Sequence, residues 1–561
     1  MEGYFDLGDY YRAITTDSAE AETWFNRGLK WCYAFHHTEA QRCFEKVIEI
    51  DPECAMGYWG LAHAMGPYYN ITWVGMPYPM RKMALAATYE NSRKAYSLIK
   101  NTTPIEAALI EAALSRFQQS AVEKMDDYEA FFAVWNDDFA NAMRQVYAQF
   151  SDDDDVCALT AEALMVRTPW KLWHLASGEP AEGADTLEIL QILETALERS
   201  EKQGNVAHPG LHHFYIHAME MSPYPEKALA VADRTWLMMP DAGHHNHMPS
   251  HIYVLCGQYT KTIQANVDAV AADYKYLAVD DTPGVFYIYY GHNLHFQVFG
   301  ALFSGQYAEA LRAAKEIEQR IRVEEFQVKA DFLVDFVEWT FPMRAHVYMR
   351  FGKWDEILAE PLPEDQTVYS VTTATWHYAK GIAHAVLGSI EQALEQQKLF
   401  RAAREAIPEE RTHYNNASYD VMGIAEAMLE GELEYRRGNY DVAFDYLRNS
   451  VYLYDNLNYA EPWAWMQPPR HALGALLLEQ GHVAEAAAVY KADLGLDDTL
   501  QRPSQHPNNI WALHGYAECC QLLGNDEEYK AIKQELDKAQ AVTEFEVKAS
   551  CLCRKVDDCC G

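Results

Sequence analysis

The chain has 561 residues, of which 49% are hydrophobic and 13% aromatic, and its formal net charge is −36. This length exceeds that of a single-core domain, so we expect several domains or an array of repeats. A surface this acidic repels phosphate backbones and anionic membrane surfaces. We therefore expect neither a nucleic acid nor a membrane as a partner.

No targeting segment is expected either. The first residues, Met1-Glu2-Gly3-Tyr4, lack the basic and apolar regions of a signal peptide, and no apolar run approaches the length of a membrane span. The 11 cysteines mostly stand alone within helical patterns, which is typical of reduced, buried thiols. These features predict a cytoplasmic protein.

A repeat frame begins close to the N-terminus. When Trp24 is set at position four of a 34-residue frame, five further signature residues fall at positions 8, 11, 20, 24 and 32, namely Gly28, Trp31, Ala40, Phe44 and Pro52. The tetratricopeptide repeat has glycine, an aromatic residue, alanine, an aromatic residue and proline at these positions. Its small residues let two antiparallel helices approach closely, so the segment predicts a helix–turn–helix unit.

Later units share a turn glycine that is followed two residues on by an aromatic residue. Glycine suits this turn because it accepts the left-handed backbone angles that end a helix. The turn glycines are Gly257, Gly305, Gly352 and Gly438, and two further turns, at Gly388 and Gly481, lack the aromatic residue. Period-two strand patterns are nearly absent. We therefore predict an all-α fold, an α-solenoid superhelix of tetratricopeptide-like helix–turn–helix repeats.

The repeat frame loosens between residues 55 and 204. Helices are expected there over residues 79–100, 104–119, 126–150 and 155–166. The acidic run from Ser151 to Asp155 is interpreted as a helix start, because acidic residues suit a helix N-terminus and a calcium loop needs alternate spacing. Aromatic-rich breaks at 66–73 and 169–173 either plug the superhelix or line its concave face.

We divide the chain into three regions. Residues 1–330 form an N-terminal repeat region that carries a histidine-rich site, and residues 331–545 continue the same solenoid as C-terminal tetratricopeptide-like repeats. Residues 546–561 form a Cys-rich tail, which we expect to be disordered, as chain termini usually are. A thiol-rich metal site or an acylation site is the alternative for this tail.

Histidines concentrate in one stretch, since eight of the chain's 22 lie between His208 and His251. In a helix, His213, His217 and Glu220 share one face, because they are four and three residues apart. His247 and His251 are also four apart and flank a proline that suits a first helical turn. Two helices therefore offer a set of imidazole and carboxylate ligands.

A second histidine pair follows one unit later. His292 and His295 are three residues apart in a segment that reads as a helix from residue 285 onward. If this helix lies next to the previous unit of the solenoid, both side chains reach the same cavity.

Several motifs together resemble a widespread family of tetratricopeptide-repeat proteins. The matching segments are Phe35–Ala40, Asp51–Ala62, His208–Glu220, Gly243–Tyr253 and Gln467–Arg470. The resemblance covers most of the chain up to about Leu494. It implies the same repeat fold and a protein-binding role.

The resemblance also implies which polar residues matter. The family's histidines fall on His37, His208, His213, His217, His244, His247, His251, His292 and His295, and its acidic residue on Glu220. This chain departs from the family at His36, where the family tends to have Asn, in the extra His212 and His245, and in its Cys-rich tail.

The first functional interpretation is a metal-dependent enzyme with a His/Glu site inside the solenoid. Imidazole suits Fe, Cu, Zn and Mn, and mixed His/Glu sets are typical of catalytic sites. We expect His213, His217, His247, His251, His292 and His295 to bind metal. Glu220 and His244 are the expected catalytic residues, Glu220 as a ligand or general base. The expected small-molecule substrate pocket is lined by Tyr215, Tyr253, Tyr289, Trp170, His37 and His208.

The reaction type is left between oxidative and hydrolytic chemistry. The set is rich in histidine and poor in carboxylates, which favours Fe or Cu and an oxidoreductase over Zn or Mn and a hydrolase.

Two alternatives stand beside this interpretation. A single histidine on an apolar helix face is usually a core residue that is bonded to a carbonyl or carboxylate. The whole chain also fits a scaffold that binds a peptide or protein partner, in which the C-terminal repeats present the binding surface.

Overall fold

The computed structural model describes residues 3–123, 127–282, 284–329 and 332–554. The chain forms two compact units. Unit 1 spans Met1–Ile252 and Ala271–Val279, and unit 2 spans Tyr253–Val270 and Asp280–Gly561. The predicted boundary at residues 330 and 331 lies outside the described residues.

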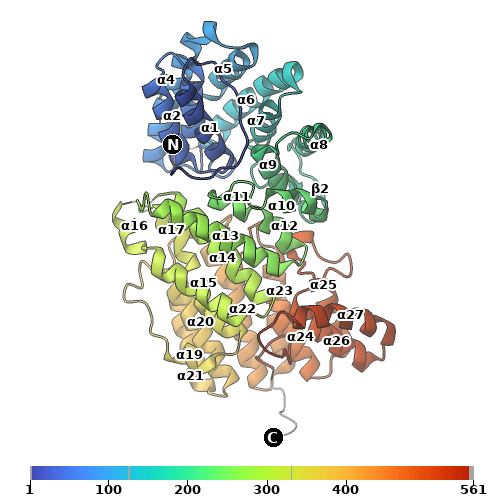
Figure 1. The fold of residues 1–561 in the computed structure, drawn as a ribbon. Coiled ribbons are helices and arrows are strands. Elements are labelled where there is room, and N and C mark those ends of the chain that lie inside the picture. Colours follow the sequence, from blue (N-terminus) through green and yellow to red (C-terminus); the bar gives the residue numbers. More distant parts are fainter. Residues whose placement is uncertain (1–2, 124–126, 283, 330–331, 555–561) are drawn as a thin grey trace. The chain divides into compact units, whose positions relative to one another are not determined.

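Unit 1 is built from helices and one short strand pair (Figure 1). Its elements are α1 (Ala19–Tyr33), α2 (His37–Ile50), α3 (Ala55–Met65), α4 (Tyr78–Ser97), η1 (Ile99–Asn101), α5 (Pro104–Arg116), α6 (Tyr128–Phe150), α7 (Asp154–Met165), β1 (Trp173–His174), β2 (Glu179–Pro180), α8 (Thr186–Gln203), α9 (Pro209–Glu220), η2 (Pro225–Ala228), α10 (Leu229–Thr235) and α11 (Gly243–His247). Helices α12 (Pro249–Leu255) and α13 (Tyr259–Leu277) have residues in both units.

Unit 2 has the same helical character. Its elements are α14 (Phe286–Phe303), α15 (Tyr307–Arg320), α16 (Val323–Lys329), α17 (Phe332–Val337), η3 (Glu338–Thr340), α18 (Met343–Arg350), α19 (Trp354–Ala359), α20 (Ser370–Val386), α21 (Ile390–Glu405), β3 (Thr412–His413), β4 (Asn416–Ala417), α22 (Ser418–Arg436), α23 (Tyr440–Asp455), α24 (Pro469–Glu479), α25 (Val483–Asp493), η4 (Arg502–Ser504), α26 (Ile510–Leu523) and α27 (Asp526–Gln540). The strands pair antiparallel, β1 with β2 and β3 with β4.

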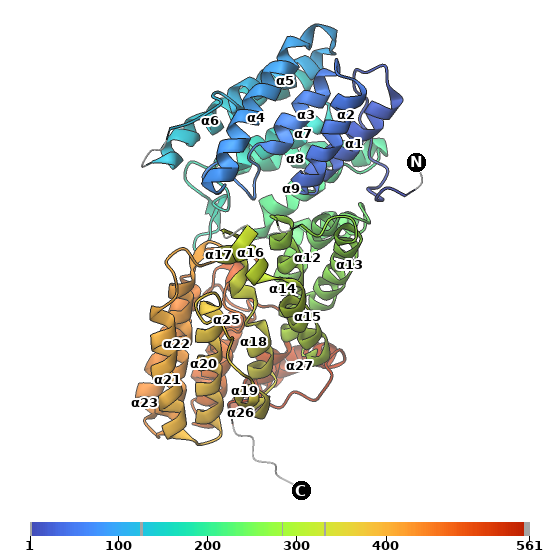
Figure 2. The same ribbon diagram turned by 90° about the vertical axis from the view of Figure 1, so that its left-hand side faces the viewer.

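Consecutive helices pack against each other in pairs, as in tetratricopeptide repeats. Contacts join α1 with α2, α20 with α21, α22 with α23, and α24 with α25. Figure 2 shows α20 to α23 running side by side as such pairs. The protein is therefore an all-α solenoid of helix–turn–helix repeats, which confirms the predicted fold class. Among the described residues, every helix is too short or too polar to cross a membrane.

The repeat signature has the expected physical basis. A Cβ atom at Gly28 would lie 2.8 Å from the ring of Phe44, and one at Gly60 would lie 2.3 Å from it. Only glycine lets α1 and α3 approach this ring. All six predicted turn glycines have positive φ angles, between 61° and 84°. The periodic features of the sequence therefore identify the turns correctly.

The expected helices between residues 55 and 204 are also present. They correspond to α4, α5, α6 and α7, and the predicted start at Asp126 lies outside the described residues. The acidic run begins α7 as expected, because the Asp153 side chain accepts a hydrogen bond from the amide of Val156.

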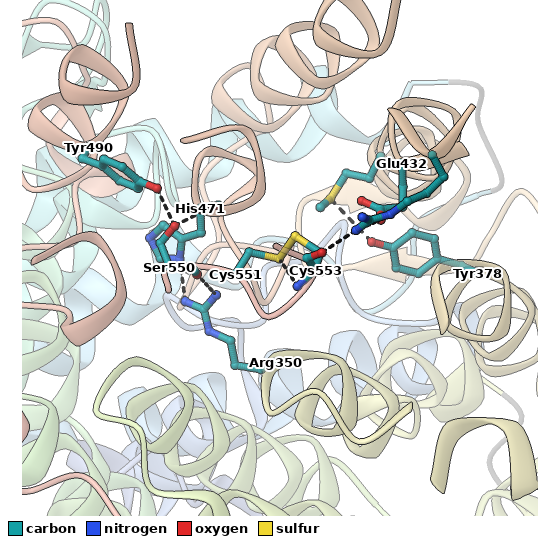
Figure 3. The surroundings of a disulfide bond; sticks show 10 residues. Arg350, Tyr378, Glu432, His471, Tyr490, Ser550, Cys551 and Cys553 are labelled. Atoms are coloured by element: carbon teal, nitrogen blue, oxygen red, sulfur yellow. Dashed lines mark hydrogen bonds and ion pairs between the residues drawn. A yellow bond between two sulfur atoms is a disulfide. The ribbon is translucent and has the colours of Figure 1, made fainter. Parts of the chain in front are cut away.

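The C-terminal segment differs from the expected disordered tail over its described part. Ser550 and Cys553 are buried, and Cys551 and Cys553 form a disulfide. Figure 3 shows Ser550 close to Arg350, His471 and Tyr490. Its carbonyl accepts a hydrogen bond from Arg350, and its hydroxyl donates to the carbonyl of His471 and is hydrogen-bonded to the hydroxyl of Tyr490. These hydrogen bonds order the segment. Residues 555–561, with the remaining two cysteines of the tail, lie outside the described residues.

Candidate metal centre

Helix α9 carries the first half of the histidine cluster. It begins at Pro209, and the imidazole of His208 caps it by accepting a hydrogen bond from the amide of Leu211 at 3.1 Å. His213, His217 and Glu220 then lie on one face of the helix and are completely buried, at 0% exposure. The predicted shared face is therefore present in the structure.

Helices α11 and α12 carry the second half. His244 and His247 belong to α11, and His251 belongs to the first turns of α12, which starts at Pro249. All three side chains are buried. Ligand nitrogens of His213, His217 and His244 lie within 4.8 Å of one another. The structure thus brings α9 and α11 together at the residues that the sequence singled out.

The Nδ1 atoms of three of these histidines are bonded to groups that only accept hydrogen bonds. His213 Nδ1 lies 2.5 Å from the carbonyl oxygen of Tyr33. His217 Nδ1 lies 2.9 Å from Glu220 Oε1, and His251 Nδ1 lies 2.5 Å from Glu220 Oε2. Each Nδ1 must therefore carry the proton, and in a neutral ring this leaves a bare lone pair on Nε2.

The lone pairs of His213 and His217 face each other, because their Nε2 atoms are 3.1 Å apart. His251 Nε2 lies 2.7 Å from Nε2 of His247, whose Nδ1 lies 3.4 Å from the hydroxyl oxygen of Ser250. Two facing lone pairs repel unless a proton or a metal ion lies with them. Burial lowers the pKa of His217 to about 3 and that of His213 well below its ordinary value, which disfavours a proton. Unprotonated imidazole nitrogens in this arrangement fit a bound metal cation.

Both carboxylate oxygens of Glu220 are hydrogen-bonded to histidines, unlike those of a carboxylate that is free to bind a metal. One carboxylate oxygen accepts a hydrogen bond from His217, and the other accepts one from His251. Carboxylates that hold the Nδ1–H of a ligating histidine fix its tautomer and ring orientation. The same residues also form a second group of possible metal ligands, because ligand atoms of His217, Glu220 and His251 lie within 4.8 Å of one another.

Aromatic rings border the cluster within unit 1. The ring of Phe35 lies 4.3 Å from that of His213, and it stacks on His217 at 5.7 Å and on His244 at 5.5 Å. Tyr69 lies 4.9 Å from His217 and 5.3 Å from Trp170. Phe35 and Trp170 both have positive φ angles, of 54° and 53°, which side chains of this size rarely adopt. Strained backbone of this kind clusters at functional sites.

The other predicted pocket residues of unit 1 have varied surroundings. His37 stacks on Tyr68 at 3.9 Å, and its Nδ1 donates to the carbonyl of Ala64 at 2.9 Å. The hydroxyl of Tyr215 donates to Glu194 on α8 at 3.1 Å. His208 binds Asp155 at 3.1 Å. A pocket role for these residues stays a prediction.

Four predicted site residues belong to unit 2. Tyr253 and Tyr289 are buried there. His292 Nδ1 lies 2.5 Å from the hydroxyl of Tyr414, and His295 Nε2 lies 2.7 Å from the sulfur of Met466. The role of these four residues in the site stays a prediction.

The sequence did not identify Phe35 and Tyr69 as neighbours of the cluster histidines. Nor did it identify Asp155 as the hydrogen-bond partner of Tyr33 and His208. Phe35 lies in a family-like segment and Tyr69 in an aromatic-rich break, so each carried a weak signal. Asp155 carried a signal only for a helix start.

Comparisons with known proteins do not assign the chain to a family. No family model matches the sequence, and no curated protein matches it. A chain of the APC/C hetero-tetramer Cut9-Hcn1 is 13% identical, with 94% of this chain and 95% of that chain covered and a TM-score of 0.26. Human IFIT1, solved as a dimer with m7Gppp-AAAA, is 12% identical, with 79% and 96% covered and a TM-score of 0.29. Yeast Tom70 is 11% identical, with 94% and 99% covered and a TM-score of 0.26. These values assign the chain to none of these proteins' families.

Proposed function

We propose that the chain is a metalloprotein that holds a transition metal at the buried imidazoles of His213, His217, His244, His247 and His251. The observation that carries this proposal is that the Nε2 atoms of His213 and His217 face each other, while their Nδ1 protons are bonded to the Tyr33 carbonyl and the Glu220 carboxylate. Such outer hydrogen bonds are the usual companions of metal-binding histidines. A core histidine needs no second imidazole opposite its bare nitrogen.

We further propose a metal-dependent enzyme that acts on a small molecule. Fe or Cu is favoured over Zn or Mn, because the donors are mostly imidazole. Either ion would supply one-electron chemistry, and oxidative chemistry is therefore favoured over hydrolysis. Phe35 and Tyr69 would exclude water from the cluster, and His244 would serve as a third ligand or as an acid–base group.

The engagement of both Glu220 oxygens favours an orienting role for Glu220 over the predicted role of base or ligand. In this role the carboxylate keeps the Nδ1 protons of His217 and His251 in place. The Nε2 atoms then remain available to the metal.

Metal content is the direct test. The purified protein is incubated with iron, copper, zinc and manganese salts in turn, desalted and analysed for metal. We expect near-stoichiometric Fe or Cu in the wild type and a strong loss in a His213→Ala/His251→Ala variant. His377→Ala serves as the control, since this histidine binds Gln396 on the neighbouring helix of unit 2. Equal metal content in all three proteins, or none in the wild type, contradicts the proposal.

A second candidate function is binding of a protein partner, and one observation favours it. A groove of about 850 Å³ lies in unit 1 between the β1–β2 pair, α8 and η2, lined among others by Trp173, Glu194, Lys202, Tyr224 and Lys227. The exposed ring of Tyr224 and the charged side chains suit a peptide. A scaffold of this kind would tolerate His217→Ala with unchanged partner binding. The predicted partner surface on the C-terminal repeats stays a prediction.

A further inference from the structure

One buried carboxylate in unit 1 gathers four hydrogen-bond donors. Asp155 Oδ2 accepts from the hydroxyl of Tyr10 at 2.6 Å and from the guanidinium of Arg12 at 2.5 Å. Its Oδ1 accepts from the hydroxyl of Tyr33 at 2.5 Å and from Nε2 of His208 at 3.1 Å. Asp155 is only 3% exposed, so these four donors replace water around its charge.

Two of these donors, Tyr33 and His208, belong to residues that position the histidine cluster. Tyr33 is the last residue of α1, and its carbonyl oxygen is the acceptor for His213 Nδ1. His208 is the cap of α9, the helix that carries His213 and His217. Because Nδ1 of His208 accepts from the amide of Leu211, its Nε2 must carry the proton that Asp155 receives. The tautomer of His208 is therefore determined from both sides.

We propose that Asp155 is a positioning residue of the metal centre, which joins the end of α1 to the start of α9 and so aims His213 Nε2 at the metal. The inference rests on the proposed metal-binding function. The Tyr33 side chain is held by Asp155 while its backbone holds the ring of His213. A shift of either helix end moves the ring or weakens the hydrogen bond that keeps its proton on Nδ1. Outer partners of this kind typically change metal affinity 10- to 100-fold.

The test compares Co²⁺ and Cu²⁺ binding by the wild type, Asp155→Asn and Tyr33→Phe. Tyr33→Phe removes one hydroxyl and leaves the carbonyl that His213 uses, so it perturbs folding least. We expect dissociation constants raised about 10-fold or more in both variants. We also expect a changed visible spectrum of bound Co²⁺ and changed electron paramagnetic resonance parameters of bound Cu²⁺.

Asp493→Asn is the matched control. Asp493 is equally buried and accepts from two histidines, His471 at 2.8 Å and His506 at 2.9 Å, but it belongs to unit 2. The Asp493→Asn substitution should lower thermal stability while leaving the metal affinity and both spectra unchanged.

The outcomes separate the two proposals. A wild type that binds metal, together with variants that lose stability but keep its affinity and spectra, overturns the positioning role and leaves the metal centre standing. A wild type that binds neither ion overturns the metal centre, and the positioning role with it. Weakened binding in both variants but not in the control supports the role.

Discussion

At the scale of the residue, protonation decides what the histidine cluster can do. A buried imidazole next to a carbonyl has one possible tautomer, and its second nitrogen must then accept a proton, a hydrogen bond or a metal ion. In His213 and His217 these second nitrogens face each other at 3.1 Å. The tautomers are imposed by Tyr33 and Glu220, so a change at either partner alters the ligands without removing them.

A Glu220→Gln substitution tests this logic with almost no change in volume. The amide offers one acceptor oxygen and one donor nitrogen, so either His217 or His251 must turn its Nδ1 into an acceptor. Its proton then moves to Nε2 and competes with the metal. We expect metal affinity to fall about 10- to 100-fold while the apoprotein stays folded. Isothermal titration with Cu²⁺ and circular dichroism measure the two quantities.

Glu338→Gln is the control for this substitution. Glu338 is also completely buried, and it accepts hydrogen bonds from the backbone amides of Val371 and Thr372 in unit 2. Its loss should cost stability without an effect on Cu²⁺ binding. Equal Cu²⁺ affinity in wild type and Glu220→Gln would rule out an orienting role for Glu220.

At the scale of the element, close helix contact decides whether the cluster forms. Helix α9 approaches the end of α1 at Gly210, where a Cβ atom would lie 2.6 Å from the ring of Tyr33 and 3.1 Å from the ring of His208. Both rings are held by Asp155 and have little freedom to move away. The geometry of the repeat turns was predictable from the turn glycines. The contact between Gly210 and Tyr33 joins residues almost 180 positions apart and has no local sequence pattern.

A Gly210→Ala substitution should therefore separate α9 from α1. We expect a loss of about 1–3 kcal/mol in the free energy of unfolding, as for other overpacked contacts. A weaker metal site should accompany it, since His213 follows on the next turn. Urea unfolding and metal titration measure both effects.

Gly423→Ala is the comparison in helix α22. Its added Cβ would lie 3.3 Å from the end of the flexible Arg404 side chain and 3.8 Å from Leu453, and alanine favours the helix. This variant should unfold at an equal or higher urea concentration than the wild type. A Gly210→Ala protein that unfolds like Gly423→Ala would show that the α1–α9 contact adapts freely.

At the scale of the whole molecule, buried neutral histidines make stability depend on pH. Burial lowers the pKa of His212 and of His245 to about 3 and that of His37 to about 4, each from an ordinary value of 6.5. Between these values the unfolded chain binds protons that the folded chain does not. Stability contributed by these groups is therefore complete above pH 6.5 and is lost as the pH falls.

His245→Gln isolates one of these contributions. We expect the difference in unfolding free energy between pH 7 and pH 5 to shrink in this variant relative to wild type. The substitution removes a slope of about 1.4 kcal/mol per pH unit at most. Urea unfolding of the metal-free proteins at both pH values measures it. An unchanged pH dependence would show that His245 is protonated, or solvated, in the folded chain.

The sequence by itself determined the local features of this protein. The repeat frame around Gly28 and Phe44, the turn glycines and the four-residue spacing of His213 and His217 all follow from periodicity within one or two helices. Such patterns need only the geometry of the helix and of the turn, so they can be read without knowledge of the fold.

Only the tertiary structure decided how these features act together. It supplied the carbonyl of Tyr33 for His213, the double engagement of Glu220, the stacking of Phe35 and the anchoring of α9 by Asp155. It also placed Ser550 in hydrogen bonds with Arg350 and Tyr490, within a segment that was expected to be disordered because it lies at the chain terminus. These contacts join segments far apart in the chain, and their partners are selected by packing and by the cost of burying an unsatisfied polar group.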